Sequence, residues 1–165
     1  MKEKIPLQDL IKYVLEEARI VLPGVQAFFG FQLIAVFNQR FKELDPVSQY
    51  IHLGATFLTL ISVALVLTPA AYHRQVEPDR VSTSFIKFAS TLLCISLFPL
   101  ILSMGLDSYV ITKLVTNNNL LAVLAAVPAF LVPIYFWYYI PQRERAHHKR
   151  LGPETEHTPL HHISA

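Results

Sequence analysis

The residues best suited to acid–base chemistry lie in two short segments, here called the rim segments. They are Glu16, Glu17 and Arg19 before one apolar run, and Tyr72, His73 and Arg74 after another. An imidazole changes its charge near neutral pH, so a nearby carboxylate can exchange a proton with it. A carboxylate near a guanidinium instead forms an ion pair. Two interpretations stay open: a clamp between two helices at the membrane surface, or a pH sensor or proton relay built on Glu17 and His73.

The sequence lacks the motifs of known enzyme chemistry. It contains no glycine-rich phosphate loop, no nucleophile elbow and no paired catalytic carboxylates. The histidines of the C-terminal segment are His147, His148, His157, His161 and His162. Imidazoles bind zinc or copper, but Pro159 breaks the helical spacing and no acidic or cysteine partner is fixed nearby. We therefore expect no enzyme, no cofactor and no metal site.

The apolar runs carry few titratable groups, and none near their middle. His52 and Lys87 fall near the ends of runs, and Asp107 falls near the far end of the third. Uncharged polar residues inside the runs are Gln26, Gln32, Thr56, Thr59, Ser62, Ser90, Thr91, Ser96 and Ser103. Such groups hydrogen-bond neighbouring helices, at about 0.6 to 2 kcal/mol each. We expect an interior without titratable groups, with a polar conduit formed by several copies as the alternative.

Composition and hydropathy define the fold class. Of the 165 residues, 53% are hydrophobic and only 16% are charged, and the net charge of +2 gives no reason to expect nucleic-acid binding. A helix crosses a bilayer with about 20 apolar residues, and four runs reach this length, at about 20–37, 50–71, 85–106 and 120–140. Backbone amides find no partners in hydrocarbon, so each run must be helical. The prediction is an all-α integral membrane four-helix bundle.

Three regions follow along the chain. Residues 1–19 read as an amphipathic helix that leads into the first span and contain no secretory signal, residues 20–140 form the membrane domain, and residues 141–165 form a polar, histidine-containing tail. From Ala146 onward the composition predicts disorder. Asp45 precedes Pro46, an arrangement that begins a helix. Caps for the other spans are available at Asp79, Ser82 or Ser84 and at Asn117, Asn118 or Asn119.

Lysine and arginine residues predict the orientation. Eleven of the 14 fall in the N-terminal segment, the loop after the second span and the C-terminal segment, which share one side of a four-span protein. The other side holds Arg40, Lys42 and Lys113. Cytoplasmic loops carry the excess of positive charge, so both termini are expected in the cytoplasm.

Small residues and prolines inside the spans predict close packing and kinks. The residues concerned are Pro23, Gly24, Gln26, Pro69, Pro99, Ala122, Ala126 and Pro128. Proline removes a backbone donor and frees the carbonyl four residues earlier, which bends a helix and can serve gating. Alanines four apart let helices approach closely, within the chain or between chains.

Two motifs resemble those of a known family. EARIVLPGVQ at residues 17–26 and PAAYHR at residues 69–74 are similar to the two signatures of a family of small bacterial membrane proteins of unknown function. Arg40-Phe41 fits as well, and the similarity covers residues 8–142. The resemblance implies a four-span protein of the bacterial cytoplasmic (inner) membrane. Some members carry the label sodium:proton antiporter, but such exchange needs a carboxylate deep in the bilayer, which this reading of the spans does not supply.

These observations predict a non-enzymatic multi-pass membrane protein that works as a homo-oligomer or as an accessory subunit of a larger membrane complex. Its partners would be the lipid bilayer, other membrane protein subunits or copies of itself, without nucleic acid. The alternative is an oligomeric ion or proton transport protein of the sodium:proton type. In that case Glu16, Glu17 and His73 at the cytoplasmic rim would act as gate or sensor.

Overall fold

A computed structural model describes residues 6–77 and 82–150 of the chain. These residues are almost entirely helical and contain no β-strand. The elements are the α-helices α1 (Leu7–Val36), α2 (Pro46–Val76), α3 (Thr83–Thr116), α4 (Asn119–Ile134) and α5 (Ile140–Arg150), the 3₁₀-helix η1 (Gln39–Glu43) and the π-helix η2 (Tyr135–Tyr139). Four helical stretches are long and apolar enough to cross a membrane, which confirms the predicted all-α class with four spans.

Side-chain caps fix where the helices begin. Asp45 accepts a hydrogen bond from a backbone N–H in the first turn of α2, Ser82 does so for α3, and Asn118 does so for α4. These side chains satisfy amide groups that have no partner inside a helix. Asn117 ends α3 in the left-handed conformation, with φ 49°. The tight reversal from α3 into α4 therefore depends on a residue type that tolerates positive φ.

The helices extend beyond the apolar runs from which they were predicted. The lead-in segment and the first span form the single helix α1, and α3 continues ten residues past the predicted end at Leu106 to Thr116. Hydropathy detects only the part of a helix that lies in hydrocarbon, whereas the helical hydrogen bonds continue into polar sequence. For the same reason the disorder predicted from Ala146 onward is wrong as far as Arg150, where α5 ends. The rest of that segment, including His157, lies outside the described residues.

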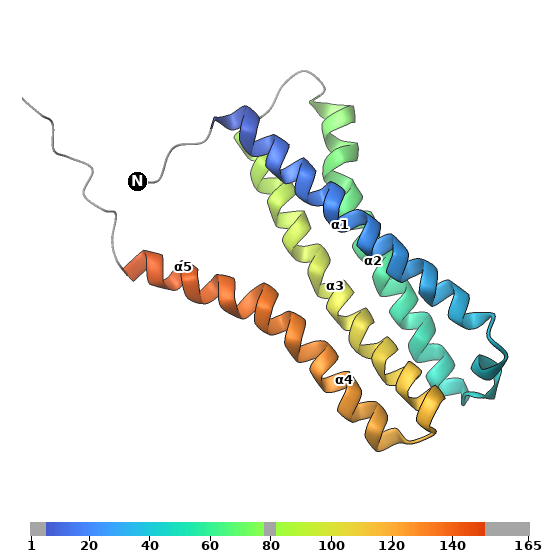
Figure 1. Ribbon diagram of the computed structural model, residues 1–165. Coiled ribbons are helices and arrows are strands. Elements are labelled where there is room, and N and C mark those ends of the chain that lie inside the picture. Colours follow the sequence, from blue (N-terminus) through green and yellow to red (C-terminus); the bar gives the residue numbers. More distant parts are fainter. Residues whose placement is uncertain (1–5, 78–81, 151–165) are drawn as a thin grey trace, which may run out of the picture.

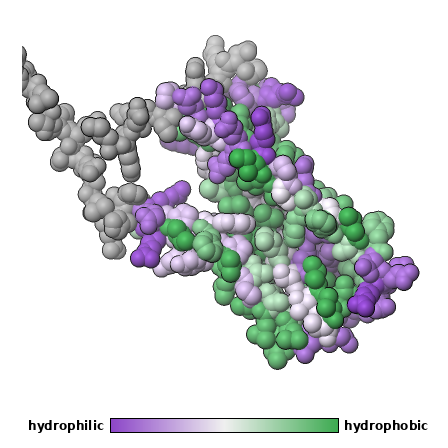
Figure 2. All heavy atoms as spheres, in the orientation of Figure 1, coloured by the Kyte–Doolittle hydropathy of each residue, from purple (hydrophilic) through white to green (hydrophobic). Residues whose placement is uncertain are grey.

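Helices α1, α2 and α3 lie side by side, and α4 packs on the outer side of α3 (Figure 1). The continuous helical rod of α4, η2 and α5 diverges from the bundle toward its C-terminal end (Figure 1). We call the end with the start of α1 and the end of α2 the proximal end, and the end with η1 and the α3–α4 turn the distal end. Hydrophobic residues cover the middle of the helices, and hydrophilic residues gather toward the ends (Figure 2).

The buried apolar core divides into small clusters. At the proximal end Ile11 and Val14 of α1 pack on Phe85 and Ala89 of α3. A second cluster at the distal end consists of Phe41, Leu44 and Val110. Between the two, the buried faces of α1, α2 and α3 are largely polar or small. Hydrogen bonds between helices therefore contribute to the centre of the bundle beside apolar packing.

Candidate functional site

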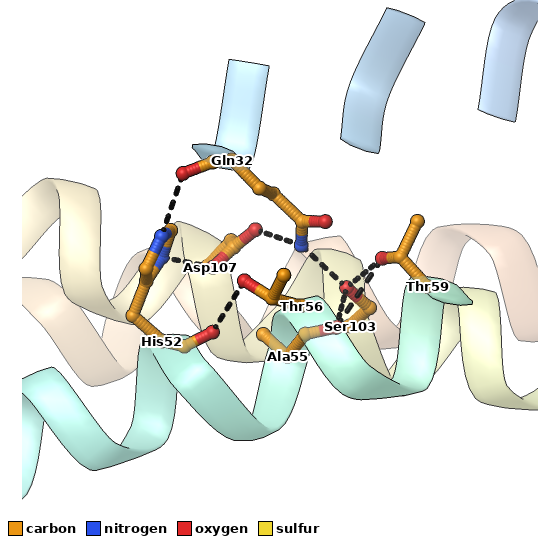
Figure 3. Close-up of polar contacts among 7 residues, drawn as sticks. All are labelled: Gln32, His52, Ala55, Thr56, Thr59, Ser103 and Asp107. Atoms are coloured by element: carbon orange, nitrogen blue, oxygen red, sulfur yellow. Dashed lines mark hydrogen bonds and ion pairs between the residues drawn. The ribbon is translucent and has the colours of Figure 1, made fainter. Parts of the chain in front are cut away.

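An imidazole and a carboxylate meet inside the bundle. His52 of α2 and Asp107 of α3 each expose only 3% of their surface, and Nδ1 of His52 lies 2.9 Å from Oδ1 of Asp107. Nε2 of His52 lies 2.9 Å from the backbone carbonyl oxygen of Gln32 in α1 (Figure 3). Three helices thus contribute to one site, which we call the core cluster: Gln32, His52, Thr59, Ser103 and Asp107.

Hydrogen-bond roles restrict where protons sit in the His52–Asp107 pair. A carbonyl oxygen only accepts, so Nε2 of His52 carries a hydrogen and donates to Gln32. Nδ1 then donates to a carboxylate as part of an imidazolium, or accepts from a protonated carboxyl. Either arrangement places one proton between Nδ1 and Oδ1 and leaves the pair neutral overall. Loss of that proton would leave a net charge on two side chains that are almost completely buried.

The amide of Gln32 connects this pair to two hydroxyl groups. Its Nε2 donates to Oδ2 of Asp107 at 2.5 Å and to Oγ of Ser103 at 2.8 Å. Oγ of Ser103 donates to the backbone oxygen of Ala55 at 2.8 Å and lies 2.6 Å from Oγ1 of Thr59 (Figure 3). Oε1 of Gln32 is buried without a hydrogen-bond partner. That oxygen leaves the core cluster one free acceptor, which suits a water molecule or a cation.

The polar contacts continue toward the proximal end. Ser62 of α2 donates to the backbone oxygen of Ser96 in α3 at 2.8 Å, and both side chains are buried. The next residue on this face of α2 is Val66, which exposes only 1% of its surface. A line of polar side chains therefore runs from Asp107 to Ser96 and ends at an apolar side chain; among the described residues no hydrogen bond joins Thr59 to Ser62.

Helical periodicity explains why α2 presents this line. Its buried residues alternate in spacing between four and three: Ser48, His52, Ala55, Thr59, Ser62, Val66 and Pro69. Such spacing places side chains on one face of a helix. His52 lies six residues into α2, about 9 Å from its first residue at 1.5 Å per residue. Asp107 lies nine residues before the end of α3, about 13 Å from it.

The bundle therefore buries two titratable groups, and both lie toward the distal ends of their spans, as the sequence indicated, and not at mid-span. His52 and Asp107 were assigned to the ends of spans because the apolar runs stop near them, but both helices continue past them. Each ion-forming side chain is buried only because the other is present. Two features of the sequence could have predicted the pair. His52 lies on the same helical face as Thr59 and Ser62, and Asp107 lies in the part of the third span that is at the same end of the bundle as His52.

The rim segments come together only in part. Arg19, His73 and Arg74 line one open cleft between α1 and α2, with a volume of about 890 Å³. Glu16 and Glu17 are exposed and do not line it. Within residues 6–77 and 82–150 no ion pair joins either glutamate to His73 or Arg74.

The expected salt-bridge clamp is thus not formed among the described residues. Tyr72 and His73 of the second rim segment instead make aromatic contacts with α3. The rings of Tyr72 and His73 pack on the ring of Phe85, with centroids 5.9 and 5.4 Å apart. These contacts join α2 to α3 at the proximal end.

The residues expected to serve packing fall into two groups. Pro69, Pro99, Ala122 and Ala126 are buried, whereas Pro23, Gly24, Gln26 and Pro128 are exposed. Both alanines lie on the face of α4 that packs on α3, so they serve contact within the chain. A Cβ atom at Gly105 of α3 would overlap the ring of Phe130, which shows how closely α3 and α4 approach. The helices run through all four of these prolines, and a gating role for them stays a hypothesis.

Metal-binding residues do not gather in the described part of the chain. There, no group of three or more His, Cys, Asp or Glu side chains is placed to hold a metal ion. The side chains of His147 and His148 lie outside this description, as do His157, His161 and His162.

Four helices long and apolar enough to cross a membrane indicate a multi-pass membrane protein. More narrowly, the chain belongs to the family of unknown function DUF6328, whose model matches residues 8–141. The resemblance predicted from the two motifs is confirmed to this extent. No curated protein and no solved structure matches the chain.

Proposed function

We propose that this protein is non-enzymatic and moves protons across a membrane through its helix bundle. The observation that carries the proposal is the buried His52–Asp107 pair, 2.9 Å apart. Ionisable residues inside membrane spans are costly and mark proton or ion pathways. Proton transport, the alternative derived from the sequence, is therefore favoured over a role as an oligomer or accessory subunit. The proposed proton-binding site is the core cluster and not the cytoplasmic rim.

The polar line gives such a proton a route. From the His52–Asp107 pair, hydroxyl groups of Ser103, Thr59 and Ser62 follow toward the proximal end. The cleft lined by Arg19 and Arg74 extends from the proximal end to Val66. Ser62 and Val66 are four residues apart, about 6 Å along α2. One apolar side chain thus separates the polar line from the cleft, and hydrophobic constrictions of this kind gate pores by excluding water.

The proposed orientation places both termini in the cytoplasm of a bacterium, with the protein in its inner membrane. Eleven of the 14 lysine and arginine residues support this side. In this orientation the proximal cleft opens to the cytoplasm, and the His52–Asp107 pair lies in the outer half of the bilayer.

Proton flux into liposomes tests the proposal. Purified protein would be reconstituted with a trapped pH-sensitive dye, under a membrane potential set by potassium and valinomycin. We expect flux above that of protein-free liposomes, and its loss in Asp107→Asn. Glu43→Gln removes an exposed acid from the distal end and serves as the matched control that keeps flux. Absence of flux under proton and sodium gradients alike would refute the proposal.

Association with other subunits or copies is a second candidate function, and Gln26 supports it. This residue lies ten positions before the end of α1, about 15 Å along the helix and hence near mid-membrane. Its side chain is exposed. An amide facing lipid lacks hydrogen-bond partners, and a second helix supplies them.

The mass of the intact particle in mild detergent tests association. A homo-oligomer or a hetero-complex is expected, and Gln26→Leu should shift it toward the monomer. Ala27→Leu changes the size of the exposed neighbouring side chain without removing an amide, and should leave the mass unchanged. A monomeric particle for the unaltered protein would rule this candidate out.

A further inference from the structure

We propose that the proximal cleft between α1 and α2 binds the headgroup phosphate of an anionic phospholipid. The cleft brings Arg19 of α1 together with His73 and Arg74 of α2, a pair of neighbours that lies far from Arg19 in the sequence. Guanidinium groups bind phosphate through paired hydrogen bonds, and two of them at one site suit a phosphodiester. The same cleft forms the proximal end of the proposed proton route, but the inference does not rest on proton movement.

The arginines of the cleft form no ion pair in the described part of the chain. The described residues that line the cleft include no carboxylate. His73 adds a buried Nδ1 atom without a hydrogen-bond partner. An anion would therefore bind without displacing an internal partner of either arginine.

The apolar part of the lining favours a lipid over free phosphate. Leu15, Leu22, Val66 and Leu67 line the same cleft as the arginines. A soluble anion gains nothing from such residues, whereas the glycerol and first acyl carbons of a lipid bury apolar surface against them.

Depth in the membrane agrees with this choice. Arg19 lies 17 residues before Val36, the last residue of α1, and this distance is about 26 Å along the helix. The hydrocarbon core of a bilayer is about 30 Å thick. With the distal end of α1 at one surface, Arg19 lies close to the opposite headgroup layer. A cationic cleft with apolar walls at this level matches the chemistry of an anionic phospholipid.

Native mass spectrometry of the full-length protein in detergent tests the site. The protein would be titrated with phosphatidylglycerol and, separately, with phosphatidylcholine. We expect the anionic lipid to bind at least about tenfold more tightly, and Arg19→Gln/Arg74→Gln to remove this preference. Lys87→Gln/Arg143→Gln removes two exposed positive charges elsewhere and should keep it. Arg19→Lys/Arg74→Lys, which keeps the charge but loses the planar fork, should give an intermediate preference.

Three results would overturn the inference. They are equal affinity of the unaltered protein for both lipids, an unchanged preference in the double glutamine variant, and displacement of the bound lipid by millimolar inorganic phosphate. The last would assign the cleft to a soluble phosphate. Thermal unfolding of each variant shows whether a loss of binding reflects a loss of fold.

Discussion

The ammonium group of Lys113 lies 2.5 Å from Oδ1 of Asp45. This ion pair joins the last turn of α3 to the N-cap residue of α2. Asp45 also accepts hydrogen bonds from the backbone and side chain of Ser48. The hydrogen bond from Lys113, and then those from Ser48, lower the pKa of the Asp45 carboxyl to about 2. The Asp45–Lys113 pair therefore connects α2 and α3 at the distal end of the bundle.

The lowered pKa of Asp45 predicts that the thermal stability of the protein depends on pH in the acidic range. A carboxyl whose pKa falls on folding stabilises the fold above its unfolded pKa, and this contribution is lost as the pH falls through the folded pKa. Thermal unfolding in detergent should show Asp45→Asn a few degrees less stable than the unaltered protein at pH 7. The gap should narrow below about pH 4 and close near pH 2. A gap that does not change with pH would contradict the assignment.

Two substitutions of Asp107 should separate structure from proton binding. In Asp107→Asn the amide donates to Nδ1 of a neutral His52 and its oxygen accepts from Gln32, so the fold should lose only about 1 kcal/mol. In Asp107→Ala the partners remain buried and unpaired, at a cost of about 3 to 5 kcal/mol. Denaturation in detergent measures both. Equal stability of the two variants would mean that the hydrogen bonds of the core cluster contribute little.

Glu17→Gln distinguishes the core cluster from the rim as the site of proton binding. Glu17 is exposed and lies outside the proximal cleft, so its neutral variant should keep the proton flux of the unaltered protein. Flux would be recorded in liposomes at matched protein density. Loss of flux in Glu17→Gln, together with normal flux in Asp107→Asn, would return the proton relay to the rim.

Replacing the apolar side chain of Val66 by a polar one should increase proton flux. Val66→Thr keeps the shape of the side chain and adds a hydroxyl between Ser62 and the cleft. If one hydrogen bond lowers the barrier by about 1 kcal/mol, flux rises about fivefold. Val66→Ile keeps the apolar barrier and should not raise flux. An increase in both variants would indicate a general leak.

Gly105 predicts the cost of a close helix contact. Gly105→Ala places a methyl group against the ring of Phe130 and should destabilise the protein by about 1 to 3 kcal/mol. Gly54→Ala is the matched control, since nothing lies within 4 Å of its added Cβ atom. Phe130→Ala in the Gly105→Ala background should recover part of the loss. Additive losses in the double variant would contradict direct contact.

The general architecture was predictable because hydrophobicity and helical capping act locally. Hydropathy located all four spans, and Asp45, Ser82 and Asn118 were among the caps read from the sequence. Helix ends were predicted less well, since the backbone hydrogen bonds of α3 continue ten residues beyond the apolar run.

The core cluster was not predicted, because it depends on how the helices turn toward one another. A histidine and an aspartate that are 55 residues apart meet only when α2 and α3 adopt one particular rotation. For the rim segments the error was the reverse, since a contact was expected that the described residues do not form. Glu17 and Arg74 were placed on the same side of the membrane by the sequence, but a shared side does not make two side chains face each other.

The same long separations bear on how the chain is made. His52 needs Gln32, 20 residues earlier, and Asp107, 55 residues later. During synthesis the α1–α2 hairpin therefore emerges with an imidazole whose acidic partner has not yet been translated. The core cluster can therefore be completed only after α3 has been translated and has packed against that hairpin.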